Sequence, residues 1–224
     1  MQFSTELLAR AKGVRDSSAR VVVIEDDADF RESVGRLLRS AGLEPCLFAT
    51  VADFVGSEPV DGPTCLVLDV RLPGRSGLDF QRDLMATSVT LPIVFITAHG
   101  DIRMGVEAMK AGAIEFLTKP FRDQDLLDAV NAGLARDRAR REDEVALRAL
   151  RLRFEALTPR ERAIAIQVAE GRLNKQIAAD MGVTETTVKV HRSNMMRKLN
   201  APSVAELCRL VDKLKLVPER ADGR

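Results

Sequence analysis

The chain has 224 residues, of which 46% are hydrophobic and 30% charged, a composition typical of globular proteins that hold one large domain or two small ones. Its net charge of +1 hides an asymmetry between two regions. Residues 20–130 carry 11 Lys and Arg against 18 Asp and Glu, whereas residues 151–224 carry 15 Lys and Arg against 9 Asp and Glu. Only the second region therefore favours a polyanionic partner. No apolar stretch is long enough to span a bilayer, and residues 1–19 lack the apolar segment of a secretory signal. We therefore expect a cytoplasmic protein.

Residues 1–19 are a leader to which no function is assigned. Leu7 and Leu8 are flanked by Arg10 and Lys12, a pattern compatible with a frayed helix and equally with a mistaken translation start. Three parts are expected after the leader: a first domain at 20–130, a charged helical linker at 131–153 and a second domain at 154–217.

The first domain alternates short apolar runs with segments of helical periodicity. Clear apolar runs occur at 21–24, 65–68 and 93–96, and weaker ones at 44–48 and 113–117. A segment such as 30–38 has the apolar spacing of an amphipathic helix. Alternation of this kind is typical of a parallel sheet wrapped by helices. We therefore predict an α/β fold with a doubly wound, five-stranded parallel sheet.

Polar residues stand at the carboxyl ends of the predicted strands. Glu25 and Asp26 follow the first strand, Asp69 the third and Thr97 the fourth, and Lys119 lies after the fifth. Because ligands of an open parallel sheet bind beyond the carboxyl ends of its strands, these side chains are expected to form one site. Clustered carboxylates repel one another unless a cation neutralises them, and Mg²⁺ prefers oxygen ligands. The sequence therefore predicts a Mg²⁺ site at this edge.

Carboxylates, a metal ion, a lysine and a hydroxyl in one place can bind a phosphate group or accept one covalently. Asp69 is the best candidate nucleophile, because it ends a central apolar strand and the Pro73-Gly74 turn that follows keeps its approach open. Asp27 and Asp29 are instead predicted to be solvated residues at a helix start, where the helix dipole favours acidic side chains.

Four segments of the first domain resemble the motifs of two-component response-regulator receivers. They are VVVIEDD, LVLDVRLPGRSGLDF, IVFITAHGD and AGAIEFLTKPF. The resemblance implies a flavodoxin-like receiver fold over residues 20–130, Asp69 as the phosphoacceptor and a histidine kinase as the phosphoryl donor.

The resemblance also assigns roles to the residues around Asp69. Glu25 replaces the commoner Asp of the acidic pair, which adds one methylene to the pocket wall. The implied metal ligands are Asp26, Asp69 and the backbone carbonyl of Arg71, with Glu25 acting in the acidic pocket through a water. The implied reactive and switch residues are Thr97 as the hydroxyl that follows the phosphoryl group, Lys119 as its cationic partner and Phe116 as the aromatic switch.

Structural alternatives stand beside three of these roles. Thr97 could cap the segment that follows it, and Phe116 could be an ordinary core residue. Lys119 could be a surface turn residue, although a lysine beside three carboxylates favours ion pairing. The Lys119–Pro120 bond is predicted to be cis on the strength of the resemblance alone.

A change in the helical pattern predicts the linker after the first domain. Apolar positions recur at helical spacing over 126–134, residues 136–144 are almost entirely charged, and apolar positions resume at Val145. We predict a long helix with a solvated middle, in which Gly133 is a weak point. The helix is either a lever or dimer helix that reports the state of the first domain, or a passive spacer.

Capping signals divide the second domain into four short helices. The expected helices run from Pro159 to 170, from Asn174 to 181, from Thr184 to about 199 and from Ser203 onward, with Thr158, Asn174, Thr184 and Ser203 as caps and Glu206 completing the last capping box. Gly182 forms the turn between the second and third helices. Two helices joined by such a turn are typical of the helix-turn-helix, whose second helix enters the major groove of DNA.

The third helix of this domain has an inward apolar stripe and an outward polar face. The stripe consists of Val188, Met195 and Leu199. The outward residues that can reach base edges are Thr186, Lys189, Val190 and Ser193. The residues predicted to meet phosphates are Arg192, Arg197 and Lys198. His191 stays open between packing and a contact with the DNA backbone.

The segment LTPRERAIAIQVAEGRLNKQIAADMGVTETTVKVHRSNMMRKL resembles the LuxR-type helix-turn-helix of NarL/FixJ response regulators, over residues 155–214. The resemblance implies that Lys189, Val190 and Ser193 read bases and that Lys175 lies near the phosphates. It also suggests a dimer contact on the last helix, through residues that could equally be core: Leu207, Val211 and Leu214.

We therefore predict a response-regulator transcription factor that is not an enzyme. Mg²⁺-dependent phosphorylation of Asp69 by a histidine kinase is expected to control homodimerisation and the binding of double-stranded promoter DNA, with RNA polymerase as a further candidate partner. Two alternatives stay open. One is a DNA-binding regulator that works without phosphorylation, and the other is a metal-dependent phosphohydrolase in which Asp27 and Asp29 form the nucleophile motif.

Overall fold

A computed structural model of the chain describes residues 19–58, 61–87, 89–98, 100–214 and 216. The predicted leader lies outside the described residues except for Ala19. The chain divides into two compact units, the first ending at Arg141 and the second beginning at Glu142.

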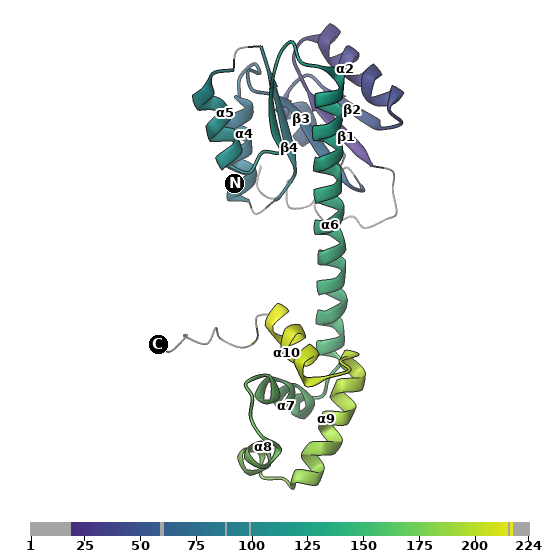
Figure 1. Cartoon of the computed structure of the whole chain (residues 1–224), viewed down its shortest axis with the longest axis vertical. Helices are drawn as coiled ribbons and strands as arrows, with labels where there is room; N and C mark the ends of the chain where they lie inside the picture. The colour runs from purple at the N-terminus through teal and green to yellow at the C-terminus, as the bar shows by residue number, and fades with distance from the viewer. Residues whose placement is uncertain (1–18, 59–60, 88, 99, 215, 217–224) are drawn as a thin grey trace. The chain divides into compact units, whose positions relative to one another are not determined.

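The first unit contains a five-stranded, all-parallel sheet with strand order β2-β1-β3-β4-β5 (Figure 1). Its strands are β1 (Arg20–Ile24), β2 (Glu44–Phe48), β3 (Thr64–Asp69), β4 (Ile93–Thr97) and β5 (Glu115–Thr118). β2 has the predicted bounds, and the ends of the other strands lie within two residues of the predicted ones. The predicted fold class is confirmed.

Helices cover both faces of this sheet. One face packs against α2 (Ala28–Ser40) and the first part of α6 (Asp123–Glu155), and the other against α3 (Val51–Gly56), α4 (Gly77–Ala86) and α5 (Ile102–Lys110). Successive side chains of a strand point to opposite faces. Accordingly, Val21 and Val23 join the core beneath α2 and α6, whereas Val22 and Ile24 join the core on the other face. Strands that are apolar on both sides are what a doubly covered parallel sheet requires.

The helix α6 runs without interruption from the predicted first domain into the predicted linker. Gly133 is not a weak point, because a Cβ atom there would lie 2.5 Å from the Sγ atom of Cys65, and glycine therefore allows the helix to approach β3 closely. The prediction of a solvated middle is wrong for Asp137, which is fully buried. Its carboxylate accepts hydrogen bonds from the backbone N–H of Thr64 at 2.9 Å and from Nε of Arg141 at 2.7 Å.

In the described part of the second unit, α6 is followed by α7 (Pro159–Ala169), α8 (Asn174–Met181), α9 (Glu185–Leu199) and α10 (Val204–Lys213). The predicted caps of α7, α9 and α10 are confirmed, and each accepts a hydrogen bond from the N–H of the third helical residue; they are Thr158, Thr184 and Ser203. Of the helices in the described residues, none is long and apolar enough to cross a membrane.

The predicted cap of α8 is wrong. Asn174 is the first residue inside the helix, and Leu173 occupies the cap position. Because a leucine side chain cannot accept a hydrogen bond, Oε1 of Gln176 accepts one at 2.8 Å from the N–H of Leu173. Gly182 ends α8 with φ 64°, in the left-handed region that glycine tolerates, and so forms the predicted turn.

The core of the second unit settles one alternative left open by the sequence. Leu207 and Val211 of α10 are fully buried with Ile164 of α7 and Val188 of α9. These two residues are therefore core residues within one chain. Leu214 is only half-buried at the end of α10.

Candidate functional sites

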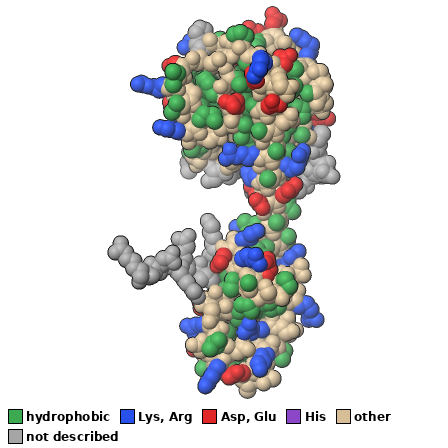
Figure 2. All heavy atoms as spheres, viewed as in Figure 1, with side chains coloured by type: hydrophobic (Ala, Val, Ile, Leu, Met, Phe, Trp, Pro, Cys, Tyr) green, Lys and Arg blue, Asp and Glu red, His purple; other side chains and the backbone are tan. Residues whose placement is uncertain are grey.

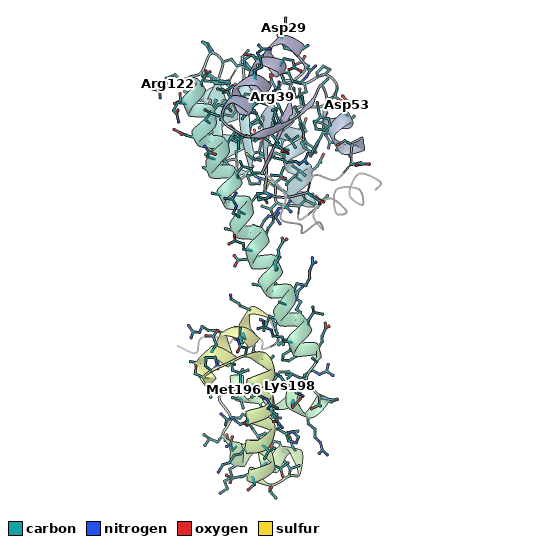
Figure 3. All side chains as sticks on the ribbon, turned by 90° about the vertical axis from the view of Figure 1, so that its right-hand side faces the viewer. Asp29, Arg39, Asp53, Arg122, Met196 and Lys198 are labelled. Atoms are coloured by element: carbon teal, nitrogen blue, oxygen red, sulfur yellow. The ribbon has the colours of Figure 1, made fainter. Side chains whose placement is uncertain are left out.

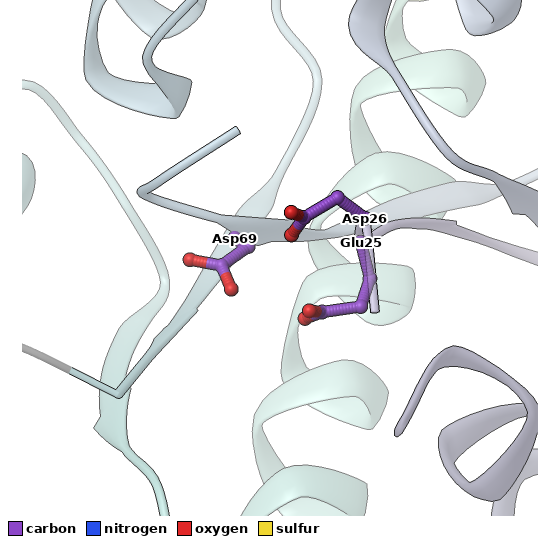
Figure 4. Close-up of side chains that lie close together, drawn as sticks. All are labelled: Glu25, Asp26 and Asp69. Atoms are coloured by element: carbon purple, nitrogen blue, oxygen red, sulfur yellow. The ribbon is translucent and has the colours of Figure 1, made fainter. Parts of the chain in front are cut away.

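The carboxyl ends of β1 and β3 bring three acidic side chains together, as Figure 4 shows. Carboxylate oxygens of Glu25, Asp26 and Asp69 all lie within 4.8 Å of one another. The exposed fraction is 1% for Glu25 and 5% for Asp69, whereas Asp26 is exposed. β1 and β3 are neighbours in the sheet, so that residues far apart in sequence end at one edge.

Lys119 bridges two of these acids. Its Nζ atom donates to Oε2 of Glu25 at 2.7 Å and to Oδ2 of Asp69 at 2.8 Å, so the structure pairs the lysine with the carboxylates as predicted. Burial would lower the pKa of Lys119, but its hydrogen bonds with Asp69 and Glu25 raise it. Burial raises the pKa of Glu25 to about 7, against the opposing effect of Lys119. The Lys119–Pro120 bond is cis.

Thr97 and Phe116 lie on the strands beside this site. Thr97 is fully buried at the end of β4, and its carbonyl accepts a hydrogen bond from the N–H of Lys119 at 2.8 Å. Thr97 does not cap the next helix, because Asp101 caps α5. Phe116 is half-buried on β5, with its ring centre 6.2 Å from that of Phe95.

The loop after β1 is anchored to the start of α2. Asp27 caps this helix by accepting hydrogen bonds at 3.0 Å from the N–H groups of Asp29 and Phe30, which agrees with the predicted helix start. Nη1 of Arg31 donates to the backbone carbonyl of Glu25 at 2.6 Å. The first turn of α2 is therefore tied directly to the acidic pair.

Two contacts of the site escaped the sequence reasoning. The backbone N–H of Arg71 donates to Oδ1 of Asp69 at 2.8 Å, and so holds the carboxylate oxygen that does not pair with Lys119. Phe30 places its ring centre 4.1 Å from the Nζ atom of Lys119. The position of Phe30 one turn after the acidic pair is the only sequence signal that points to this contact.

The helix α9 presents the predicted outward face. Val188, Met195 and Leu199 are buried, as expected for the inward stripe. The four residues predicted to face outward, Thr186, Lys189, Val190 and Ser193, are all exposed. Val190 is 55% exposed, although a valine at that position could have packed inside. Figure 2 shows Lys and Arg side chains spread over the visible face of the second unit.

The cations predicted near DNA phosphates differ in their surroundings. Lys175 and Arg197 are exposed. Arg192 is half-buried and donates a hydrogen bond to the side chain of Asn174. Lys198, labelled in Figure 3, donates from Nζ to Oε2 of Glu161 at 2.7 Å. His191 is half-buried, which is compatible with packing and with a contact to the DNA backbone.

A parallel α/β unit with a lysine-bridged acidic edge, followed by a unit that exposes the second helix of a helix-turn-helix, defines a response regulator that binds DNA. Residues 21–131 match the family of response regulator receiver domains, and residues 155–211 match the bacterial regulatory proteins of the luxR family. The chain belongs to the NarL/FixJ family of two-component response regulators. It is a transcription regulator, as the sequence predicted, and the family is not one of enzymes.

Relatives match over most of the chain. Nodulation protein W of Bradyrhizobium diazoefficiens is 50% identical over 88% of this chain and 87% of its own length. The transcriptional regulatory protein FixJ of Azorhizobium caulinodans is 39% identical over 86% of this chain and 92% of its own. The solved structure of the response regulator StyR has a TM-score of 0.75 at 48% identity, covering 88% of this chain and 100% of StyR.

Proposed function

We propose that a histidine kinase phosphorylates Asp69 and that this modification controls promoter binding by the second unit. The observation that carries the proposal is the convergence of Glu25, Asp26 and Asp69 with Lys119 at one sheet edge. A carboxylate oxygen of Asp69 attacks the phosphorus atom while the bond from phosphorus to the histidine nitrogen breaks, and the nitrogen keeps the electron pair. Lys119 offsets the negative charge that develops on the transferred oxygens.

The donor set fits Mg²⁺. The three side chains of the acidic edge offer only oxygen ligands, and exposed Asp26 leaves space for the waters that Mg²⁺ retains. Asp26, Asp69 and the backbone carbonyl of Arg71 are the proposed ligands, with Glu25 acting through a water. When bound, Mg²⁺ neutralises negative charge on the phosphoryl oxygens.

Thr97 and Phe116 are the proposed switch residues. The Thr97 hydroxyl is placed on the strand next to Asp69 and donates to the new phosphoryl group, and the ring of Phe116 shifts with it. Both residues border Gly100, where a Cβ atom would lie 2.8 Å from Cε1 of Phe116 and 3.0 Å from Cγ2 of Thr97. A dianionic group at Asp69 is a local electrostatic change that such a packed pair can relay.

The exposed face of α9 is the proposed reading surface for DNA. Lys189 and Ser193 offer hydrogen bonds to base edges, and Val190 offers an apolar contact to a thymine methyl group. Thr186, near the start of the helix, is a further proposed contact to base edges, and the proposed phosphate contacts are Lys175, Arg192 and Arg197. The ion pair with Glu161 gives Lys198 a competing role within the fold.

Homodimerisation on phosphorylation, contact with RNA polymerase and a cytoplasmic location complete the proposal. The phosphohydrolase alternative is disfavoured, because the carboxylate of Asp27 is engaged in capping α2. A regulator that binds DNA without phosphorylation is also disfavoured, since it leaves the lysine-bridged acidic edge without a purpose.

A quantitative mobility shift on promoter DNA tests the proposal. The full chain and an Asp69→Asn variant are compared with and without Mg²⁺ and acetyl phosphate, a small acyl phosphate that can replace the kinase. We expect the donor to increase affinity and dimer formation only in the unaltered chain. Equal activation of both proteins would contradict the role of Asp69, and turnover of a generic phosphomonoester would revive the phosphohydrolase.

A further inference from the structure

We propose that Phe30 is a positioning residue for phosphoryl transfer: the face of its ring binds the ammonium group of Lys119 and holds it beside Asp69. The inference rests on the proposed function of Asp69. It adds to the acidic edge an uncharged residue from a different element, the first turn of α2.

The geometry supports a cation-π contact. The Nζ atom of Lys119 lies over the ring of Phe30, 4.1 Å from its centre, which is well within the distance of about 6 Å at which such contacts act. The side chain of Lys119 is only 15% exposed, so water screens this contact less than at an open surface.

The ring of Phe30 is itself held in place. Its backbone N–H is fixed by the Asp27 cap at 3.0 Å. The ring of Phe121 contacts the ring of Phe30 edge to face, with ring centres 6.0 Å apart and ring planes at 88°. An aromatic face held by a helix cap and a second ring is a preorganised site for the lysine.

The chemistry explains why an uncharged partner helps. Before transfer, Lys119 is paired with the carboxylates of Glu25 and Asp69. Once Asp69 becomes an acyl phosphate, its carboxylate charge is replaced by that of the phosphoryl oxygens, and Lys119 must follow them. The attraction of the Phe30 ring does not change during transfer, so it keeps the ammonium group near the reacting atoms while its anionic partners change.

Replacement of Phe30 separates electrostatics from packing. Phe30→Leu keeps an apolar side chain but removes the ring face, whereas Phe30→Tyr and Phe30→Trp keep it. The rate of phosphorylation of the full chain by acetyl phosphate with Mg²⁺ is followed by phosphate-affinity gel electrophoresis. We expect Phe30→Leu to be roughly 3- to 30-fold slower, because loss of a cation-π contact lowers the population of Lys119 side chains held beside Asp69 by about that factor, and the two aromatic variants to stay within about twofold.

Fluorinated phenylalanines at position 30 provide the decisive readout, because fluorine weakens the negative ring face with little change of shape. The rate is expected to fall stepwise with one, two and three fluorines. Phe48→Leu is the matched control, since Phe48 is another half-buried phenylalanine, which packs on Phe54 with ring centres 5.5 Å apart. Phe48→Leu is expected to leave the rate unchanged.

Each outcome decides the inference. A flat fluorine series, or a rate for Phe30→Leu equal to that of the unaltered chain, would overturn the role of Phe30. Loss of rate in Phe48→Leu as well would reduce the effect to general packing and overturn it too. The failure of the proposed function looks different, because the unaltered chain would then incorporate no more phosphate than Asp69→Asn.

Discussion

Replacement of Lys198 by methionine tests whether this lysine contacts DNA or stabilises the fold. The sequence predicts a phosphate contact, but the structure pairs Nζ of Lys198 with Oε2 of Glu161 at 2.7 Å. Glu161 is only 4% exposed and also accepts a hydrogen bond at 2.8 Å from the N–H of Thr158. We expect Lys198 to hold α9 against α7 and not to contact phosphate.

The structure sets the size of the effect. A hydrogen bond to a charged group contributes about 1.5–3 kcal/mol. The side chain of Lys198 is 38% exposed, so water partly replaces the lost partner and we take about 1–2 kcal/mol for Lys198→Met. In a unit of this size, each 1 kcal/mol lowers the melting temperature by roughly 4–8 °C.

Two measurements on the full chain separate the roles. Hydrogen exchange of α7 and α9 amides reports the stability of the second unit, and the dependence of DNA affinity on salt counts phosphate contacts, at a slope of about 0.9 for each. Lys198→Met is expected to speed exchange and leave the slope unchanged. Arg197→Met, at an exposed neighbour, is expected to reduce the slope and leave exchange unchanged. A slope reduced by about 0.9 in Lys198→Met, with exchange unaltered, would contradict the structural role of Lys198.

Three further predictions concern stability. Asp137→Ala is expected to destabilise the first unit by about 3 kcal/mol in urea denaturation, because it removes a buried carboxylate that pairs with arginines and with the N–H of Thr64; a loss below about 0.5 kcal/mol would contradict this. Gly133→Ala is expected to lower the free energy of unfolding of the first unit by about 1–3 kcal/mol, because its Cβ atom clashes with Sγ of Cys65. Adding Cys65→Ala is expected to restore part of that free energy, and additive losses in the double variant would exclude the clash. The hydrogen bond from Lys198, and then that from Thr158, lowers the pKa of Glu161 below its ordinary value of 4.5. Its contribution is therefore present above pH 4.5 and lost as pH falls through the lowered pKa, so Glu161→Gln should flatten the acid destabilisation of the second unit measured by hydrogen exchange.

Local signals explain why most of the fold and site could be predicted. Strands buried on both faces appear as continuous apolar runs, and parallel topology then forces their carboxyl ends to one edge. This rule by itself predicts that Asp69 and Lys119 lie close together. Helix starts were predicted where the capping side chain itself carries an oxygen, as at Thr158 and Thr184.

Contacts that depend on distant partners could not be predicted. At the start of α8, Leu173 takes the cap position that Asn174 was expected to fill, because Gln176 supplies the acceptor from inside the helix. Lys198 appeared as one more cation on a DNA-binding helix, and only the folded unit shows its buried partner, Glu161. The contact of the Phe30 ring likewise depends on a distant partner, because the fold brings Lys119, which follows β5, over the ring.

The burial of Asp137 bears on whether α6 is a lever or a spacer. One face of α6 carries four buried residues at helical spacing: Leu126, Val130, Leu134 and Asp137. The buried stripe that packs on the sheet therefore extends into the charged segment, where its last member is the polar Asp137. A passive spacer has no need of a buried carboxylate bound to β3. Since Gly133 packs against β3 and is not a hinge, α6 is fixed to the first unit as far as Asp137. A helix anchored in this way would follow a displacement of β3, as the hypothesis of a lever or dimer helix requires.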